Sequence, residues 1–217
     1  MCRNLAYFSI ELRIILIIIL AEIYTSLSLR SFIRIYSIEY FLDNQCYKLA
    51  KCLKKLFKYQ SNCYDYKELV LVTRLQKGGG LGDIYKKVIK GKKIYTLSTS
   101  IFDFRAVNEN KNTAKTKIIK ISIFGIIPRI KTILTYISNP NLQKIHVLND
   151  SCDPLIYISY LICSRDYGDF VFYHHADHTF CFGALEKKWI HIDLFQNQFH
   201  ICRKRLDPIF YSMINFL

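Results

Sequence analysis

The stretch from residue 144 to residue 175, KIHVLNDSCDPLIYISYLICSRDYGDFVFYHH, decides the fold of this chain. Two apolar runs, 144–150 and 169–175, have the length and the β-branched and aromatic residues of buried strands. The apolar segment between them starts with Asp153 and Pro154, a pair typical of a helix N-cap and first helical residue. Strand, helix and strand in this order form a βαβ unit, whose two strands lie parallel in one sheet.

The rest of the chain after residue 66 repeats this alternation. We predict further strands and helices, with strands over 68–75, 92–100, 117–125 and 188–195 and helices over 84–91 and 128–139. The predicted fold class is α/β, a Rossmann-like and mostly parallel sheet over residues 67–217. Right-handed crossover connections between parallel strands bring loops 77–83, 149–153 and 174–183 to one rim of the sheet, outside the carboxyl ends of the strands. Sheets of this kind bind ligands at that rim.

Residues 1–66 are predicted to form a separate helical segment before the sheet, because they contain neither glycine nor proline. The apolar run from Ile14 to Ala21 is shorter than the roughly 20 residues that cross a bilayer. Three interpretations of this run stay open: a buried helix, a membrane-associated segment and a signal sequence. Glu11 just before the run is atypical of a signal sequence.

The end of the helical segment has the pattern of a basic amphipathic helix. Apolar residues recur at helical spacing and lysines fill most other positions; the apolar ones are Leu49, Cys52, Leu53, Leu56 and Phe57. Such a helix either docks on the domain with its lysines in solvent or lies on an anionic membrane surface.

The composition favours polyanionic partners in general. The net charge is +14 and the pI is about 9.4, which suits phosphorylated substrates or anionic lipid, although a bias toward lysine gives the same numbers. No arginine-rich run, zinc-finger spacing or RNA-binding aromatic string is present, so no nucleic-acid partner is expected. The eight cysteines include no CxxC pair, and we expect mostly buried thiols in a reducing compartment.

A glycine loop, QKGGGLGD over residues 76–83, follows the first predicted strand. Gly79, Gly80 and Gly82 would let backbone N–H groups approach a phosphate or a sugar at a helix start; a tight turn is the plainer interpretation. The loop matches neither the Walker A pattern nor GxGxxG, since the sixth position counted from Gly78 is Asp83. Asp83 is predicted to cap the following helix.

A histidine cluster, HHADH over residues 174–178, follows the strand at 169–175. Asp177 beside His178 suits acid–base or binding chemistry, because a carboxylate orients and tunes an imidazole. A hydrogen-bonded cluster that only rigidifies a loop is the alternative.

A metal site is a further alternative for this cluster. His175, Asp177 and His178 match part of the metallo-β-lactamase-type motif, but Tyr173 replaces its first histidine. Few histidines follow downstream to complete a ligand set, and we predict no metal.

The segment 170–194 resembles a segment of bacterial GT-B glycosyltransferases, in which a strand leads into a His-Ala-Asp-His core and then into an apolar strand ending in Asp. The residues that carry the resemblance are His175, Ala176, Asp177, His178, Phe180, Gly183 and Asp193. His146, Asn149 and Asp150 resemble the preceding strand and its Asn-Asp loop, and the glycine loop resembles the family's first strand-to-helix turn, with Leu81-Gly82 in place of its usual polar residue.

This resemblance implies the acceptor-side half of a GT-B fold, without the half that holds the donor. It implies His178 as the acid–base group and Asp177 as its orienting partner; the implied substrate-binding residues are His174, His175, Asn149, Asp150, Gly79, Gly80 and Gly82. The implied partners are a nucleotide sugar as co-substrate, a glycan or lipid-linked acceptor, an anionic membrane surface and a separate chain with the donor half. No other cofactor is implied, and the expected location is cytoplasmic, peripheral to the inner membrane.

Two other functions compete with the transferase. One is a metal-dependent hydrolase that uses the His-His-Ala-Asp-His cluster. The other is a non-enzymatic basic module that binds membrane or nucleic acid.

Overall fold

The computed structural model describes most of the chain, namely residues 2–31, 35–57, 63–73, 80–92, 94–99, 116–120, 125–149, 152–163, 169–174, 180–193 and 211–213. The helices are α1 (Cys2–Ser31), α2 (Tyr36–Leu56), α3 (Gly80–Ile89), α5 (Ile126–Ile137) and α6 (Leu155–Cys163). The strands are β1 (Glu68–Val72), β2 (Ile94–Ser98), β3 (Thr116–Lys120), β4 (Lys144–Leu148), β5 (Asp169–His174), β6 (Ile190–Asp193) and β7 (Tyr211–Met213).

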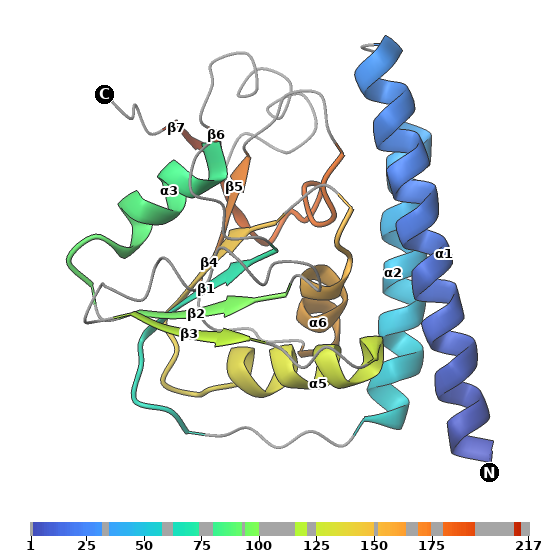
Figure 1. The fold of residues 1–217 in the computed structure, drawn as a ribbon, viewed down its shortest axis with the longest axis horizontal. Helices are drawn as coiled ribbons and strands as arrows, with labels where there is room; N and C mark the ends of the chain where they lie inside the picture. The colour runs from blue at the N-terminus through green and yellow to red at the C-terminus, as the bar shows by residue number, and fades with distance from the viewer. Residues whose placement is uncertain are drawn as a thin grey trace.

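The strands form one sheet in the order β3-β2-β1-β4-β5-β6-β7, and every neighbouring pair is parallel. The predicted α/β fold class with a Rossmann-like parallel sheet is therefore confirmed. The order reverses between β1 and β4, as it does in doubly wound sheets. Helix α3 lies on one side of the sheet and α5 and α6 lie on the other, as Figure 1 shows.

Alternation along the strands explains why both faces are covered. In β4, Ile145 and Val147 point into the core beneath α5 and α6, whereas Leu148 belongs to the core beneath α3. The same alternation places Phe170 and Phe172 of β5 on the α5–α6 side. Strands buried on both faces require near-continuous apolar runs, which the sequence supplies.

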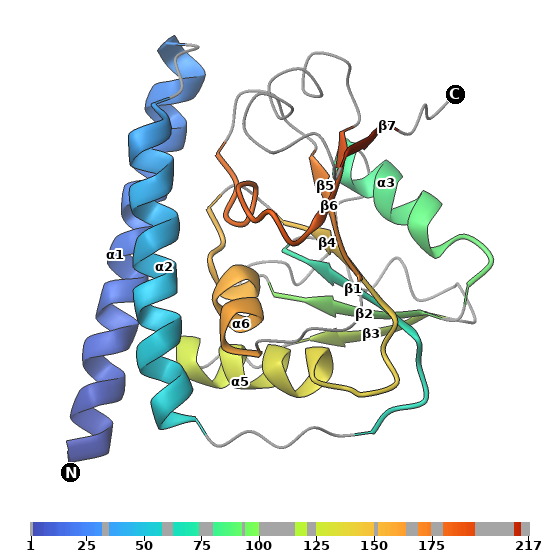
Figure 2. The same ribbon diagram turned by 180° about the vertical axis from the view of Figure 1, so that it is seen from behind.

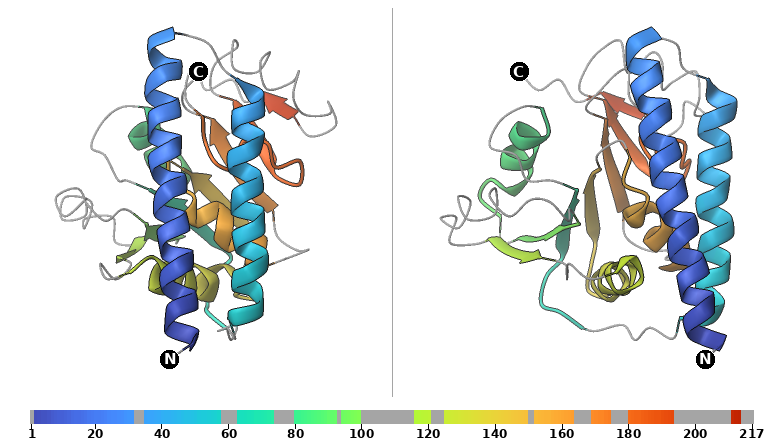
Figure 3. Two further views of the ribbon diagram at one scale, coloured as in Figure 1. Left: turned by 90° about the vertical axis from the view of Figure 1, so that its right-hand side faces the viewer. Right: turned by 45° about the vertical axis from the view of Figure 1, so that its right-hand side comes forward.

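The N-terminal helices form an outer layer on the α5–α6 side, seen from the back in Figure 2. Helix α1 packs inward through Ile10, Ile14, Ile17, Ala21 and Tyr24, which are all buried and recur every three or four residues. Figure 3 shows α1 and α2 antiparallel in front of the rest of the molecule.

A carboxylate joins this outer layer to the inner one. Glu11 of α1 accepts a hydrogen bond from the backbone N–H of Ile127, 3.1 Å away at the start of α5. One of the N–H groups that a helix start leaves without an intrahelical partner is thereby satisfied.

The predicted elements agree with the structure in type and differ at their ends. Asp153 caps α6 as predicted, since its Oδ1 accepts the Leu155 N–H at 2.9 Å. Two predictions were wrong. Asp83 does not cap α3, because the helix starts earlier, at Gly80, and Asp83 forms an ion pair with Lys86 at 3.2 Å within it. Residues 63–66 are not helical, because the second helix ends at Leu56.

The apolar run in α1 is buried on one side only. Ile14, Ile17 and Ala21 are buried, whereas Leu16 and Leu20 are 55% and 39% exposed. None of the described helices is both long enough and apolar enough to cross a bilayer. The cysteine prediction is confirmed in part: Cys46, Cys52, Cys63, Cys152, Cys163 and Cys181 are free thiols, and three of them, Cys46, Cys152 and Cys181, are buried.

Candidate functional site

The carboxyl edge of the sheet is polar at the point where the strand order reverses. Thr73 follows β1 directly and Asn149 follows β4 directly, and the Thr73 hydroxyl donates to Asn149 Oδ1 over 2.8 Å. Both side chains are buried, with Asn149 completely covered. Two neighbouring parallel strands thus end in hydrogen-bonded polar side chains, at the place where doubly wound sheets bind their ligands.

A second polar group extends this edge toward β2. The Thr99 hydroxyl donates to Asp153 Oδ2 over 2.6 Å, and Arg129 Nη1 of α5 donates to the Thr99 carbonyl over 3.3 Å. Burial raises the pKa of Asp153, and the hydrogen bond from Thr99 opposes that rise. Burial also lowers the pKa of the Arg129 guanidinium, which is only 2% exposed, and the nearby Asp153 opposes this change.

Asn149 also forms a hydrogen bond with the turn at 180–184, which follows the histidine cluster in the chain. Its amide nitrogen donates to the Asp153 carbonyl at 3.0 Å and to the Phe182 carbonyl at 3.4 Å. One side chain therefore joins the end of β1, the start of α6 and the turn at 180–184. The prediction that loops 149–153 and 174–183 meet at one rim is confirmed for these described residues.

The turn at 180–184 has a tightly constrained glycine. Gly183 has a φ of +86°, and a Cβ at this position would lie 2.3 Å from Cζ3 of Trp189. Trp189 is 1% exposed and stacks on Phe170 and Phe172, so its ring cannot move away from an added Cβ. The residue type at 183 is therefore fixed by backbone conformation and by a close contact together.

His174, the last residue of β5, is buried and lies against His191 of β6. Their ring atoms Nε2 and Nδ1 are 2.8 Å apart, and Nε2 of His191 donates to the Glu186 carbonyl over 2.8 Å. Burial lowers the pKa of His191 to about 4, so this ring is neutral at pH 7. His174 therefore donates to Nδ1 of His191.

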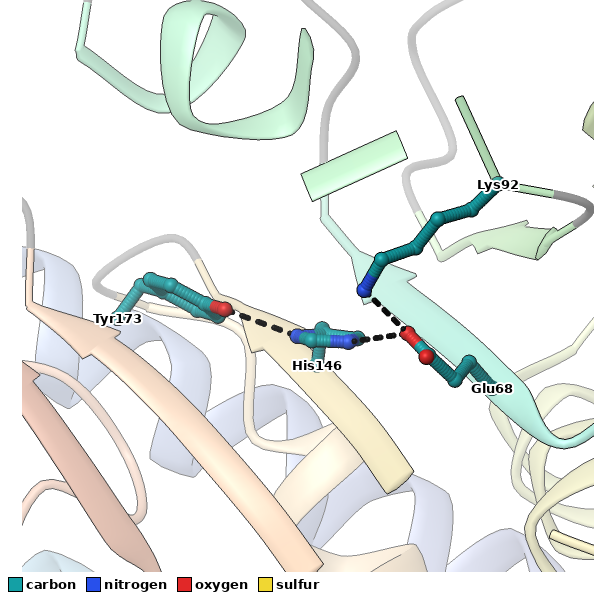
Figure 4. Close-up of polar contacts among 4 residues, drawn as sticks. All are labelled: Glu68, Lys92, His146 and Tyr173. Atoms are coloured by element: carbon teal, nitrogen blue, oxygen red, sulfur yellow. Dashed lines mark hydrogen bonds and ion pairs between the residues drawn. The ribbon is translucent and has the colours of Figure 1, made fainter. Parts of the chain in front are cut away.

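A separate polar chain crosses the α3 side of the sheet, as Figure 4 shows. The Tyr173 hydroxyl lies 2.9 Å from Nδ1 of His146, and Nε2 of His146 lies 3.1 Å from Oε2 of Glu68. Lys92 donates to the same Glu68 oxygen over 2.8 Å. Burial lowers the pKa of His146 and raises that of Tyr173 to about 12, so at pH 7 the phenol donates to a neutral imidazole. This chain ties β1, β4 and β5 together.

The other predicted site residues have mixed outcomes. Gly80 begins α3 and Gly82 is buried in its first turn, so part of the predicted glycine loop is helix. Gly79, Asp150, His175, Asp177 and His178 lie outside the described residues. Their roles stay predictions, as do the substrate-binding roles of His174 and Asn149.

The sequence interpretation missed Thr73, Thr99 and Arg129. The two threonines carried a usable signal, because each lies near the carboxyl end of a predicted buried strand, and such positions fall at the ligand-binding edge. Arg129 carried none, since an arginine inside an amphipathic helix is usually solvated. Within the described residues, no group of three or more His, Cys, Asp or Glu side chains could hold a metal ion.

No family model, no curated protein and no solved structure matches the chain.

Proposed function

We propose that this chain is the acceptor-side half of a GT-B type glycosyltransferase, which takes a sugar from a nucleotide-sugar donor to a glycan or a lipid-linked acceptor. One observation supports this most: Asn149 gathers the end of β1, the start of α6 and the turn at 180–184 at the switch point of a doubly wound sheet. In the chain, the His-Ala-Asp-His residues follow β5 and precede this turn.

The chemistry assigned to the loop is general-base catalysis. His178 takes the proton from the acceptor hydroxyl, while Asp177 orients the ring and stabilises its charged form. The acceptor oxygen then forms a bond to the anomeric carbon of the sugar, and the bond from that carbon to the diphosphate breaks. The nucleoside diphosphate leaves with the electron pair.

The first turn of α3 is the proposed anion-facing element. Its N-terminal N–H groups carry the positive end of the helix dipole, and Gly80 and Gly82 add no side chains that would block approach. Asp83 in the same turn weakens the attraction for a phosphate. This balance suits a sugar hydroxyl better than a phosphate, and the diphosphate is assigned to a donor half on a separate chain.

Sugar transfer tests the proposal. The purified chain is incubated with radiolabelled UDP-, GDP- and dTDP-sugars and with lipid-linked saccharides in vesicles, with and without candidate donor-half chains. His178→Ala is expected to lower transfer by about 100-fold to 10,000-fold, as the loss of a general base does. His200→Ala, which alters a histidine to which the proposal assigns no role, is the control and should retain transfer.

Acceptor binding gives a second readout if transfer requires a donor half. The wild-type chain is expected to bind methyl glycosides of the acceptor sugar, and His178→Ala to weaken that binding while His200→Ala does not. A wild-type chain that neither transfers a sugar nor binds a glycoside would overturn the proposal.

A further inference from the structure

Helix α1 has a second apolar face, opposite the one that packs on the domain. Large apolar side chains recur every three or four residues along this face and are 39–69% exposed: Leu5, Phe8, Leu12, Ile15, Leu16, Ile19, Leu20, Ile23 and Leu27. From Leu5 to Leu27 this face is about 33 Å long at 1.5 Å per residue. Exposed apolar faces of this length mark sites of interaction on a protein surface.

Helix α2 continues the apolar face and adds positive charge to it. Phe41 is 51% exposed and lines a groove with Leu16 and Leu20 of α1. This groove of about 240 Å³ runs between the helices, with Arg13 and Lys48 beside its apolar walls. An apolar groove with two cations beside it suits the acyl chain and the headgroup of an anionic lipid.

The charges on this pair of helices are almost all positive. Arg13 of α1 is exposed, as are four lysines near the end of α2: Lys48, Lys51, Lys54 and Lys55. Among the described residues of the two helices, Glu22 is the one exposed acidic side chain, since Glu39 and Asp43 are buried and Glu11 caps α5.

We infer that the exposed faces of α1 and α2 dock on an anionic lipid bilayer, with both helices in the plane of the surface. The apolar side chains enter the boundary between headgroups and acyl chains, and the lysines contact the anionic headgroups. A second copy of the chain fits less well, because a symmetric contact would bring the same cationic patch of both copies together. This inference does not depend on the transferase proposal.

The inner face of α1, opposite the proposed docking face, contacts residues beside the candidate site. The ring of Tyr24 in α1 packs edge-on against Phe180, with centroids 6.1 Å apart, and Cys152 lies beside Thr25 of α1. A chain docked through α1 therefore holds the carboxyl edge of its sheet close to the lipid surface, where a lipid-linked acceptor would be presented.

Vesicle co-sedimentation with matched charge variants tests the inference. The probe is vesicles of phosphatidylcholine alone or with about 30% phosphatidylglycerol, at low and at physiological salt. Lys48→Glu/Lys51→Glu in α2 is compared with Lys87→Glu/Lys90→Glu at the C-terminal end of α3. Both pairs are exposed, three residues apart and change the net charge equally. The α2 pair is expected to lower the partition coefficient at least about 30-fold, since each lysine near an anionic surface contributes about fivefold. The α3 pair is expected to leave it within about twofold.

A second variant tests the apolar contribution separately. Leu16→Ser/Leu20→Ser removes two exposed leucines without changing charge, and it is expected to lower binding to the anionic vesicles at least about tenfold. Its helical circular dichroism should match that of the wild type, because neither side chain is in the core. Equal loss from both lysine pairs, equal binding to both kinds of vesicle, or no vesicle binding together with dimerisation through this face would overturn the inference.

Discussion

Replacing Gly183 by alanine is expected to be among the most destabilising single-methyl changes in this protein. The left-handed backbone at φ +86° costs an L-residue about 1–2 kcal/mol. The new Cβ would also lie 2.3 Å and 2.6 Å from two ring atoms of Trp189, and overpacking in a filled core costs about 1–3 kcal/mol. Together the two effects lower the free energy of unfolding by about 2–5 kcal/mol.

Gly91→Ala supplies the matched control for this prediction. Gly91 has nearly the same backbone conformation, at φ +73°, but an added Cβ there meets nothing within 4 Å. Gly91→Ala should therefore lower the free energy of unfolding only through the left-handed backbone conformation, by about 1–2 kcal/mol. Urea unfolding followed by fluorescence measures both, and the signal reports on the site directly because Trp189 is the one tryptophan in the sequence. Equal destabilisation by the two variants would refute the steric argument.

Three further predictions concern stability. Asn149→Ala removes one hydrogen-bond partner from the Thr73 hydroxyl and from two carbonyls, and it should lower the free energy of unfolding in urea by about 2–4 kcal/mol. The exposed control Asn141→Ala should lower it by less than about 0.5 kcal/mol. A similar loss in both variants would contradict the hydrogen-bond network around Asn149. Burial, and to a smaller extent the nearby Glu39, raises the pKa of Asp43 above its usual value of 3.8. Because the folded state then holds this proton more tightly than the unfolded state, the wild type loses stability as pH rises from about 4 through the folded-state pKa. Asp43→Asn should therefore be more stable at pH 7, by about 1.4 kcal/mol for each pH unit between the two pKa values, and a variant without this gain would show that the carboxyl is solvated. Because the folded-state pKa of His191 is lowered from 6.5 to about 4, stability should fall by about 3 kcal/mol as pH drops across that window, and His191→Asn should remove this slope; an unchanged slope would assign the proton uptake to another group.

The sequence predicted much of the fold because the relevant signals are local. The apolar runs of β4 and β5, and Asp153 at the start of α6, all lie within about 30 residues of one another. The pairing of β1 with β4 was not predictable in this way, because the strands are far apart in the chain and each buried strand has two edges through which it can pair.

The candidate site was predictable in its position and less so in its contacts. Parallel strands put Thr73 and Asn149 at one edge, which follows from the topology. The contact of His174 with His191 depends on the register between β5 and β6, which no residue pattern specifies. The side through which α1 packs was also not predictable, because its apolar residues occupy all sides of the helix between Ile14 and Ala21.

An amide footprint tests the central claim, which is that the ligand site lies where β1, β4 and the turn after the histidine cluster meet. The ¹⁵N-labelled chain is titrated with methyl glycosides, which are too polar to enter the apolar groove of α1 and α2. The account predicts chemical-shift changes concentrated at residues 80–83, 149–153 and 174–183. Changes confined to the opposite ends of the strands or to α1 and α2, with none at the carboxyl edge, would contradict it.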